Sequence, residues 1–491
     1  MKKVAGIFVL LFVLITVGVV SAQSGVPGSG WWSGEQVQNV GDSTASITIT
    51  AYDSQSSAEY VESKSINVGE AYTFTPLSDF DTMPAGFQGS AVVSSDQPVK
   101  AIVNVTNQLA GSVGVAGGKA AGQYQGTDGA DIATTLYFPL AKGDHYGKTS
   151  SFYVQNAGSA DATNVVATFS MTNGDVHTYN VPTIGANKMV VFSVSDAGSY
   201  SPSLGDQTDR FGGLIVTGDQ PLAGVVMEHD TSASVATVLN STRGFTSASF
   251  DMKAYAPVIK NGWYGRFTGL QIQNTSGGLI DITVTYAGTG GTCAGSTFVD
   301  STTGVADGTS YTFIHLGTSG TNFPESCVGT ATIEATGDFV AIVNEQETTG
   351  SPKAGITYSA INDSATTTKV SVPLFKDGYY DALSGLQIQN IGAVATTSWS
   401  ATFNCTDTSS GTFTAISSDA KTGQIDPGAA YLFYSPSGAD LFTAGNPFVN
   451  SSVNCAVTIV ADQPIVAIVN EAPTVAGNLD DNNYEGFNLA P

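Results

Sequence analysis

One short stretch of this chain occurs four times at a nearly constant spacing. Its last copy reads DGYYDALSGLQIQNIG over residues 377–392, and related copies stand at residues 30–41, 143–158 and 261–277. The Asn of the shared Gln-Asn pair falls 117, 118 and 116 residues after the previous one, at Asn39, Asn156, Asn274 and Asn390. A fixed period of this length indicates a tandem array in which each copy is one folded unit. The repeat therefore predicts four domains.

A second marker supports the same period. Each copy closes with an acidic turn that runs into an apolar strand, in the sequences DQPVKAIVN, DQPLAGVVM, GDFVAIVN and DQPIVAIVN. Short connecting stretches with their own recurring pattern follow these strands. The markers place unit 1 at residues 23–123, unit 2 at 124–242, unit 3 at 243–357, and unit 4 with a C-terminal tail at 358–491.

Hydrophobic residues within a unit alternate with a period of two, which predicts strands. In unit 3, Leu270 and Ile272 alternate with glutamines, and residues 280–286 repeat the pattern with threonines. Unit 2 contains about seven such segments separated by turn signals. This spacing is typical of a two-sheet immunoglobulin-like β-sandwich. A small barrel or a jelly roll is the alternative. We therefore expect an all-β chain of four tandem immunoglobulin-like sandwiches.

The first 22 residues have the pattern of a secretory signal peptide. Lys2 and Lys3 precede an apolar run over residues 4–20, and small residues end at Ala22. No later segment has the roughly 20 apolar residues that a membrane-spanning helix needs. We expect a secreted product, extracellular or on the cell surface, with no membrane insertion.

The charge balance limits the partners of the chain. It carries 17 Lys and Arg against 41 Asp and Glu, a net charge of −24. Such a surface repels the phosphate backbone of nucleic acids and anionic lipids, and it favours solubility. Nucleic acid is therefore not an expected partner.

The four cysteines fall in two units, as Cys293 and Cys327 and as Cys405 and Cys455. One disulfide inside each of these units is the simplest interpretation for an exported chain, because disulfides persist in oxidising compartments. Four free thiols or a metal site are the alternatives. The spacing contains no CxxC, and no His accompanies the pairs, which argues against zinc.

No pattern in the sequence predicts catalysis. The four histidines are scattered without repeat equivalence, and no GxSxG, HExxH or phosphate-binding loop is present. Every distinctive feature recurs in each unit, whereas an enzyme usually varies one site. We expect no enzymatic activity.

Aromatic pairs at the entry of each unit are candidate binding residues. A flat apolar ring with a polar edge can stack on a sugar. The same residues could instead seal one end of a sandwich or pack against the neighbouring unit, which is the more conservative interpretation. Besides His145-Tyr146 in unit 2, the candidates for glycan or inter-domain contact are Trp31, Trp32, Trp263, Tyr264, Tyr379 and Tyr380.

Acidic clusters give a weak indication of Ca²⁺, which binds oxygen ligands. None of them matches a known calcium loop, and they do not lie at equivalent places in the units. We expect no cofactor, with calcium as the open alternative. The clusters are Asp79 with Asp81, Asp206 with Asp209, and Asp480 with Asp481.

The combined markers, an aromatic pair, then VQN or IQN, then DQP with an AIVN-type strand, resemble a tandem repeat of secreted bacterial cell-surface proteins. The resemblance covers most of the chain and implies an extracellular β-sandwich array without assigned catalytic residues. It favours a non-enzymatic structural protein that associates with itself, or with other surface proteins, into a layer, sheath or filament. The alternative is an adhesin or an array of carbohydrate-binding modules.

Two expectations concern how the units join. The constant period and short connectors predict an elongated rod of four sandwiches. Unit 1 lacks the leading strand that the other units have before Pro139, Pro257 and Pro373, so its edge should be shortened or vacant. An unpaired edge invites strand addition. The tail that contains Tyr484, Phe487 and Pro491 would then dock on unit 1 of the next chain and form head-to-tail polymers.

Overall fold

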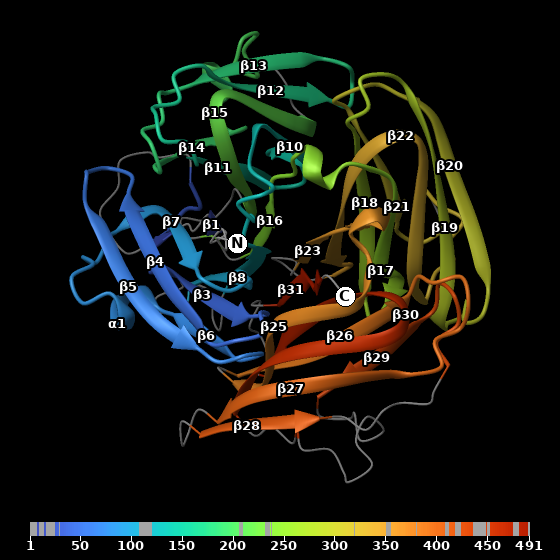
Figure 1. The fold of residues 1–491 in the computed structure, drawn as a ribbon. Helices are drawn as coiled ribbons and strands as arrows, with labels where there is room; N and C mark the ends of the chain where they lie inside the picture. Colours follow the sequence, from blue (N-terminus) through green and yellow to red (C-terminus); the bar gives the residue numbers. More distant parts are fainter. Residues whose placement is uncertain are drawn as a thin grey trace, which may run out of the picture.

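A computed structural model describes residues 7–8, 14–15, 25–28, 30–107, 120–205, 210–230, 236, 238–318, 320–349, 355–379, 381–407, 412–417, 424–435, 448, 452–474 and 481–489. The described chain is all-β, as the alternating pattern predicts, apart from one short α-helix and three 3₁₀ turns. The four repeat units follow one another around a common centre (Figure 1). No helix among the described residues is long and apolar enough to cross a membrane.

Unit 3 illustrates how one repeat folds. A long strand, β22, pairs through its first half with β17 and β19, and through its second half with β18 and β23. A buried core lies between the two halves, with Leu270, Ile282 and Ile333 inside it. The elements are β17 (Asp251–Trp263), β18 (Arg266–Asn274), β19 (Ile280–Gly291), β20 (Thr297–Val305), β21 (Ser310–His315), β22 (Cys327–Glu347) and β23 (Gly355–Ser359).

Units 2 and 4 repeat this order around long strands of the same length. Unit 2 comprises β10 (Ala133–Gly143), β11 (Lys148–Asn156), β12 (Val165–Met171), β13 (Val176–Val181), β14 (Met189–Ser193), η1 (Ala197–Ser199), β15 (Arg210–Asp230) and β16 (Leu239–Arg243), with η2 (Ser247–Ser249) after it. Unit 4 comprises β24 (Ile361–Asn362), which pairs back onto β17, then η3 (Asp363–Ala365), β25 (Thr367–Tyr379), β26 (Ala382–Asn390), β27 (Trp399–Asp407), β28 (Thr412–Ser417), β29 (Ala430–Tyr434), β30 (Val453–Pro473), β31 (Asn482–Glu485) and β32 (Phe487–Asn488).

Unit 1 differs because its long strand is split into two, at the Asp-Gln-Pro sequence. Two sheets result, and in the chain as it stands two short strands from the predicted signal peptide pair with β7. The elements are β1 (Ile7–Phe8), β2 (Leu14–Ile15), β3 (Trp31–Asn39), β4 (Ala45–Asp53), β5 (Glu59–Ile66), β6 (Ala71–Phe74), α1 (Pro76–Asp79), β7 (Gln88–Ser95), β8 (Val99–Asn107) and β9 (Ala121–Gln125).

The repeated Asn explains why the sequence marker recurs. Each copy ends a strand, as expected, and its buried side chain joins the following turn to a second loop. In unit 3 the Asn274 amide donates to the carbonyls of Gly278 and Val305, while its oxygen accepts from the Ser276 N–H. The same three hydrogen bonds recur at Asn39, Asn156 and Asn390. The marker is therefore structural.

The four connecting stretches meet at the centre of the molecule. They form β9, β16, β23 and β31, and each of these strands contacts the next one around the circle. Hydrogen bonds join all four neighbours: Ser241 donates to the Gln123 carbonyl, Thr242 contacts Ser359, the Ser359 N–H donates to Glu485, and Gln125 donates to the Glu485 carbonyl. The predicted boundaries at 123, 242 and 357 fall inside these strands, each of which pairs with the unit before it.

The expected elongated rod is wrong, because unit 4 also packs on unit 1. Ser371 of unit 4 hydrogen-bonds to Gln38 of unit 1, and Asn404 donates to the Gly69 carbonyl at 2.9 Å. Corresponding contacts join the other neighbours, including Thr330 to the Gly428 carbonyl and Ser90 to the Asn187 carbonyl. The units thus close into a ring of four (Figure 1).

The described part of the expected polymerisation tail is docked on its own chain. Tyr484 is buried in the same chain, and its hydroxyl bonds both to the backbone N–H and to the carbonyl of Leu374. Phe487 belongs to β32, which pairs with β25. Pro491 lies outside the described residues. These described residues complete unit 4 and contribute to the closure of the ring.

Candidate functional site

Units 2, 3 and 4 each bury an ion pair that sequence reasoning missed. A Lys three residues after the leading-strand Pro meets a Glu on the second half of the long strand. The Nζ–Oε distances are 2.7 Å for Lys142 with Glu228, 2.8 Å for Lys260 with Glu345, and 2.7 Å for Lys376 with Glu471. The shared Pro-x-x-Lys spacing was the available signal. In unit 1 the position of the Glu is occupied by Val105.

A second cation neutralises this Glu in units 2 and 3. Lys148 lies 3.2 Å from Glu228, and Arg266 lies 3.2 Å from Glu345. Burial would raise the pKa of Glu228, but Lys142 and Lys148 outweigh that effect and lower the pKa to about 2. Each oxygen of the Glu228 carboxylate thus lies within ion-pair distance of a lysine, Oε2 of Lys142 and Oε1 of Lys148.

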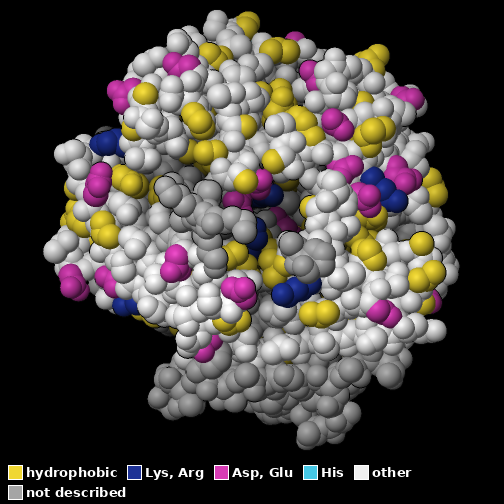
Figure 2. All heavy atoms as spheres, in the orientation of Figure 1, with side chains coloured by type: hydrophobic (Ala, Val, Ile, Leu, Met, Phe, Trp, Pro, Cys, Tyr) yellow, Lys and Arg dark blue, Asp and Glu magenta, His cyan; other side chains and the backbone are white. Residues whose placement is uncertain are grey.

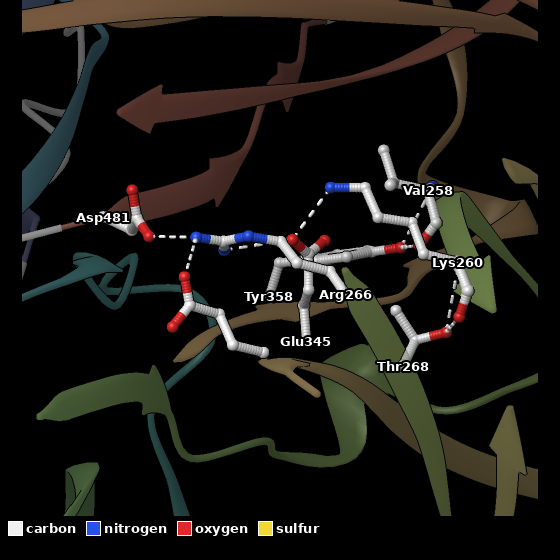
Figure 3. Close-up of polar contacts among 8 residues, drawn as sticks. Val258, Lys260, Arg266, Thr268, Glu345, Tyr358 and Asp481 are labelled. Carbon is white, nitrogen blue, oxygen red and sulfur yellow. Dashed lines mark hydrogen bonds and ion pairs between the residues drawn. The ribbon is translucent and has the colours of Figure 1, made fainter. Parts of the chain in front are cut away.

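Figure 3 shows the arrangement in unit 3. Arg266 extends between Glu345 and Asp481, and Lys260 approaches Glu345 from the other side. Burial would lower the pKa of Arg266, but Asp481 and Glu345 outweigh it and raise the pKa above its usual range. Because Asp481 belongs to the tail of unit 4, this network also holds the seam between units 3 and 4.

In unit 4 no second cation pairs with the Glu among the residues that the structure describes. Ala382 occupies the position that Arg266 has in unit 3 and Lys148 has in unit 2. The strand register shows this, because Ala382 pairs with Pro473 as Arg266 pairs with Glu347 and Lys148 pairs with Asp230. The side chain of Glu471 is 1% exposed, and its Oε2 accepts from Lys376. Its Oε1 has no hydrogen-bond partner among the residues that the structure describes. A buried polar atom in this state costs about 1–3 kcal/mol.

A pocket of about 190 Å³ lies beside this carboxylate, at the seam between units 4 and 1. Its walls combine aromatic rings with amide and hydroxyl groups. Thr106 is 4% exposed, and its Oγ1 likewise has no partner among the described residues. The lining residues that matter below are Trp32, Gln36, Asn104, Thr106, Tyr379, Ala382 and Glu471.

A second, wider hollow of about 420 Å³ continues the pocket along the same seam. The two hollows share Gln36, Tyr379 and Asn454, so they form one groove. The extension adds Tyr72 and Asp79, whose side chains are hydrogen-bonded to each other at 2.5 Å. We call the two hollows together the seam groove.

The same place between units 2 and 3 is nearly closed. Its cavity measures only about 10 Å³ and is lined by equivalent residues, among them Glu228 and Asn344. An apolar cluster containing Leu140, Val340 and Ile342 packs this seam. In unit 1, Lys100 replaces Val340, since it pairs with Gln38 as Val340 pairs with Gln273.

The structure separates the aromatic candidates. Trp32 and Tyr379, from different units, both line the seam groove. Trp31 is buried, and its indole N–H donates to the Pro27 carbonyl, so it has the structural role. The ring centroids of Trp263 and Tyr264 lie 5.0 Å apart, and Tyr264 is 87% exposed. Tyr380 lies outside the described residues.

The cysteines lie in the two pairs that the sequence predicts. The Cα atoms of Cys293 and Cys327 are 5.6 Å apart, and those of Cys405 and Cys455 are 3.9 Å apart. Both pairs are within disulfide distance inside one unit, which fits an oxidising compartment.

The acidic residues offer no clear calcium site where they are described. Asp79 accepts hydrogen bonds from Tyr72 and Thr75, and Asp481 binds Arg266. Asp81 is described as well, but no group of three or more His, Cys, Asp or Glu that could hold a metal ion occurs among the described residues. Asp206, Asp209 and Asp480 lie outside them.

Charged side chains also gather at the central hollow of the face drawn in Figure 2. A pocket of about 170 Å³ there is lined by all four connecting stretches. Two ion pairs occupy it, Lys100 with Asp128 at 3.1 Å and Arg243 with Asp131 at 3.7 Å. Burial raises the pKa of Glu485, against the opposing effect of Arg243. This pocket is therefore largely neutralised by its own residues.

No protein-family model and no curated protein matches the chain. Among solved structures, the chain is similar to Thermotoga maritima 1070, at 17% identity, over 23% of this chain and 94% of that chain, with a TM-score of 0.19. It is also similar to the infectious bursal disease virus Gx strain structure, at 9% identity, over 96% of this chain and 84% of that one, with a TM-score of 0.09. Scores this low carry no argument about fold or function.

Proposed function

We propose that this chain is a non-enzymatic extracellular protein that binds an oligosaccharide in the seam groove. The observation that carries the proposal is the meeting of Trp32 and Tyr379, from opposite ends of the sequence, in one groove lined by Gln, Asn and Thr side chains. Ring faces pack against the apolar faces of sugars, and amides and hydroxyls bond to sugar hydroxyls.

The shape of the groove supports an extended ligand. The inner pocket of about 190 Å³ and the outer hollow of about 420 Å³ are continuous along the seam. Small-molecule sites are concave, with a few polar groups that set orientation. The groove depends on ring closure, because unit 4 and unit 1 each supply one wall.

The test is binding of soluble oligosaccharides to the full mature chain, screened on a glycan array and then measured by calorimetry. We expect a ligand whose affinity falls at least tenfold in Trp32→Ala, which is about 1.4 kcal/mol. Tyr264→Ala removes an exposed ring outside the groove and should leave the affinity unchanged. Failure to bind any glycan, or equal losses in both variants, would contradict the proposal.

Export and domain type belong to the same proposal. The signal-like residues 1–22 and the two cysteine pairs support secretion. We propose that each repeat is an immunoglobulin-like sandwich domain, and the separate buried cores of units 2, 3 and 4 support this. Mass spectrometry of the exported protein should find an N-terminus near Gln23.

Self-association into a layer, sheath or filament is the second candidate function. The strands β5, β13, β20 and β28 each stand last in the strand order of a sheet, although Thr178 of β13 pairs with Ser201. Such edges can pair with another chain. Several charged residues on β5, such as Glu62 and Lys64, work against this. Sedimentation of the purified protein as a monomer at high concentration, with no ordered assembly in negative-stain images, would rule this function out.

A further inference from the structure

We propose that the inner pocket of the seam groove selects a sugar that carries a free ammonium group. This inference rests on the proposed function and specifies its ligand class. The ammonium would bind Glu471 and replace the second cation that unit 4 lacks. The molecule itself shows the expected arrangement twice, in the Glu228 and Glu345 clusters.

The argument begins with the three equivalent carboxylates. Glu228 receives Lys142 and Lys148, and Glu345 receives Lys260 and Arg266. Glu471 receives Lys376 alone, and its Oε1 has no partner among the described residues. A buried carboxylate favours a full set of charge-assisted hydrogen bonds. The vacant place is therefore a site for a cationic donor.

The space left by the missing side chain leads to the same conclusion. Ala382 stands where Arg266 stands in unit 3, and both Ala382 and Glu471 line the 190 Å³ pocket. A ligand ammonium that enters beside Ala382 follows the path that the Arg266 side chain takes toward Glu345. The pocket is thus lined by the Glu471 carboxylate, whereas the equivalent carboxylates of units 2 and 3 each pair with a second cation.

The rest of the pocket indicates that the ammonium is part of a sugar. Trp32 and Tyr379 supply ring surfaces, and Asn104 and Thr106 supply polar groups beside them. The Thr106 hydroxyl, which has no partner among the described residues, can bond to a ring hydroxyl. The net charge of −24 also favours the approach of cationic ligands.

The test compares two matched probes, the trimer of glucosamine and the trimer of N-acetylglucosamine, by calorimetry at pH 6 with the full mature chain. They differ only at the nitrogen, which is a free ammonium in one trimer and a neutral N-acetyl amide in the other. We expect the glucosamine trimer to bind at least tenfold more tightly. Ala382→Arg should abolish that preference, because the new guanidinium would occupy the vacant place. Glu471→Gln should do the same by removing the charge.

Glu334→Gln is the matched control, because it removes an exposed carboxylate that pairs with Lys253 away from the groove. It should keep the preference, and circular dichroism should show that every variant is folded. The two variants remove the same site by different means, one by adding a guanidinium beside the carboxylate and the other by neutralising the carboxylate, so a shared result does not depend on one misfolded protein.

Each other outcome overturns the inference. Equal binding of both trimers, lost in Trp32→Ala, would leave the proposed function standing and remove the ammonium. A preference that survives in both Ala382→Arg and Glu471→Gln would place the ammonium elsewhere. Tighter binding of trilysine than of either sugar would assign the pocket to protein recognition. Binding of no probe would remove the proposed ligand class together with the inference.

Discussion

The seam between units 2 and 3 and the seam between units 4 and 1 join equivalent surfaces, yet one is closed and the other open. Cavities of about 10 Å³ and about 190 Å³ occupy the same place. Two equivalent positions differ between these seams. Unit 2 has Lys148 where unit 4 has Ala382, and unit 3 has Val340 in the apolar cluster of the closed seam where unit 1 has Lys100, which pairs with Asp128.

The difference shows that a repeat protein can form a binding site where one unit lacks a side chain that the other units have. Four similar units generate four similar seams, and a site needs only a smaller side chain at one of them. The seam that opened is the one between the two ends of the sequence. It is the one seam of the ring whose units are not consecutive in the chain.

Among the buried Glu residues that pair with Lys, removal of the carboxylate should lower stability most where two cations surround it. We expect Glu228→Gln to lower the free energy of unfolding by about 3–5 kcal/mol, because two buried lysines lose their counter-charge. Glu471→Gln should cost clearly less, since only Lys376 is left unpaired. Urea denaturation of both variants measures the difference. Equal losses would mean that the two clusters are not electrostatically different.

The second largest effect should be the change of protein stability with pH that is caused by Glu35 in unit 1. Burial raises the pKa of Glu35 to about 8, well above its value in an unfolded chain. The native state therefore holds a proton that the unfolded state has lost, and this contribution to stability falls as the pH rises from about 5 to 8. Glu35→Gln should remove this fall and stabilise the protein at pH 9 relative to wild type by about 2–4 kcal/mol.

Unit 3 has an apolar residue at the position of Glu35. Strand register gives the equivalent position in unit 3 to Leu270, because Glu35 pairs with Val103 as Leu270 pairs with Val343. Thermal melts of wild type and Glu35→Gln between pH 5 and 9 make the measurement. Parallel pH profiles for the two proteins would show that Glu35 does not titrate in this range.

The hydrogen bonds of the tail residue Tyr484 should make a smaller contribution to the free energy of unfolding. Tyr484→Phe removes a hydroxyl that bonds to both backbone groups of Leu374, and Tyr358→Phe removes the same pair of bonds to Val258. We expect each to lower the free energy of unfolding by about 1–3 kcal/mol. Unchanged stability in Tyr484→Phe alone would indicate that the tail is not docked in solution.

Much of the fold could be predicted from the sequence, because its signals are local. The period of two identified strands, and the Gln-Asn marker identified the strand ends at Asn39, Asn156, Asn274 and Asn390. Ring closure could not be predicted, since it depends on contacts such as Ser371 with Gln38, which are 333 residues apart. A repeat period alone does not distinguish a rod from a ring.

Only part of the site was predictable for the same reason. Trp32 and Tyr379 were candidates as aromatic residues, but only the closed ring brings them into one groove. The Glu471 cluster was missed because its partner Lys376 is 95 residues away, although both lie at repeated positions. Aligning the units to compare Ala382 with Arg266 and Lys148 would have revealed the missing cation.

The central claim, that one seam is open and binds ligand while its equivalent is closed, can be tested with a matched pair of cysteine variants. Asn104 and Asn344 occupy equivalent strand positions in the open and closed seams. The measurement is the rate at which a bulky maleimide labels Asn104→Cys and Asn344→Cys in separate proteins. We predict labelling at least tenfold faster in Asn104→Cys, slowed by the bound oligosaccharide only in that variant. Similar rates in both variants, unaffected by oligosaccharide, would contradict the account.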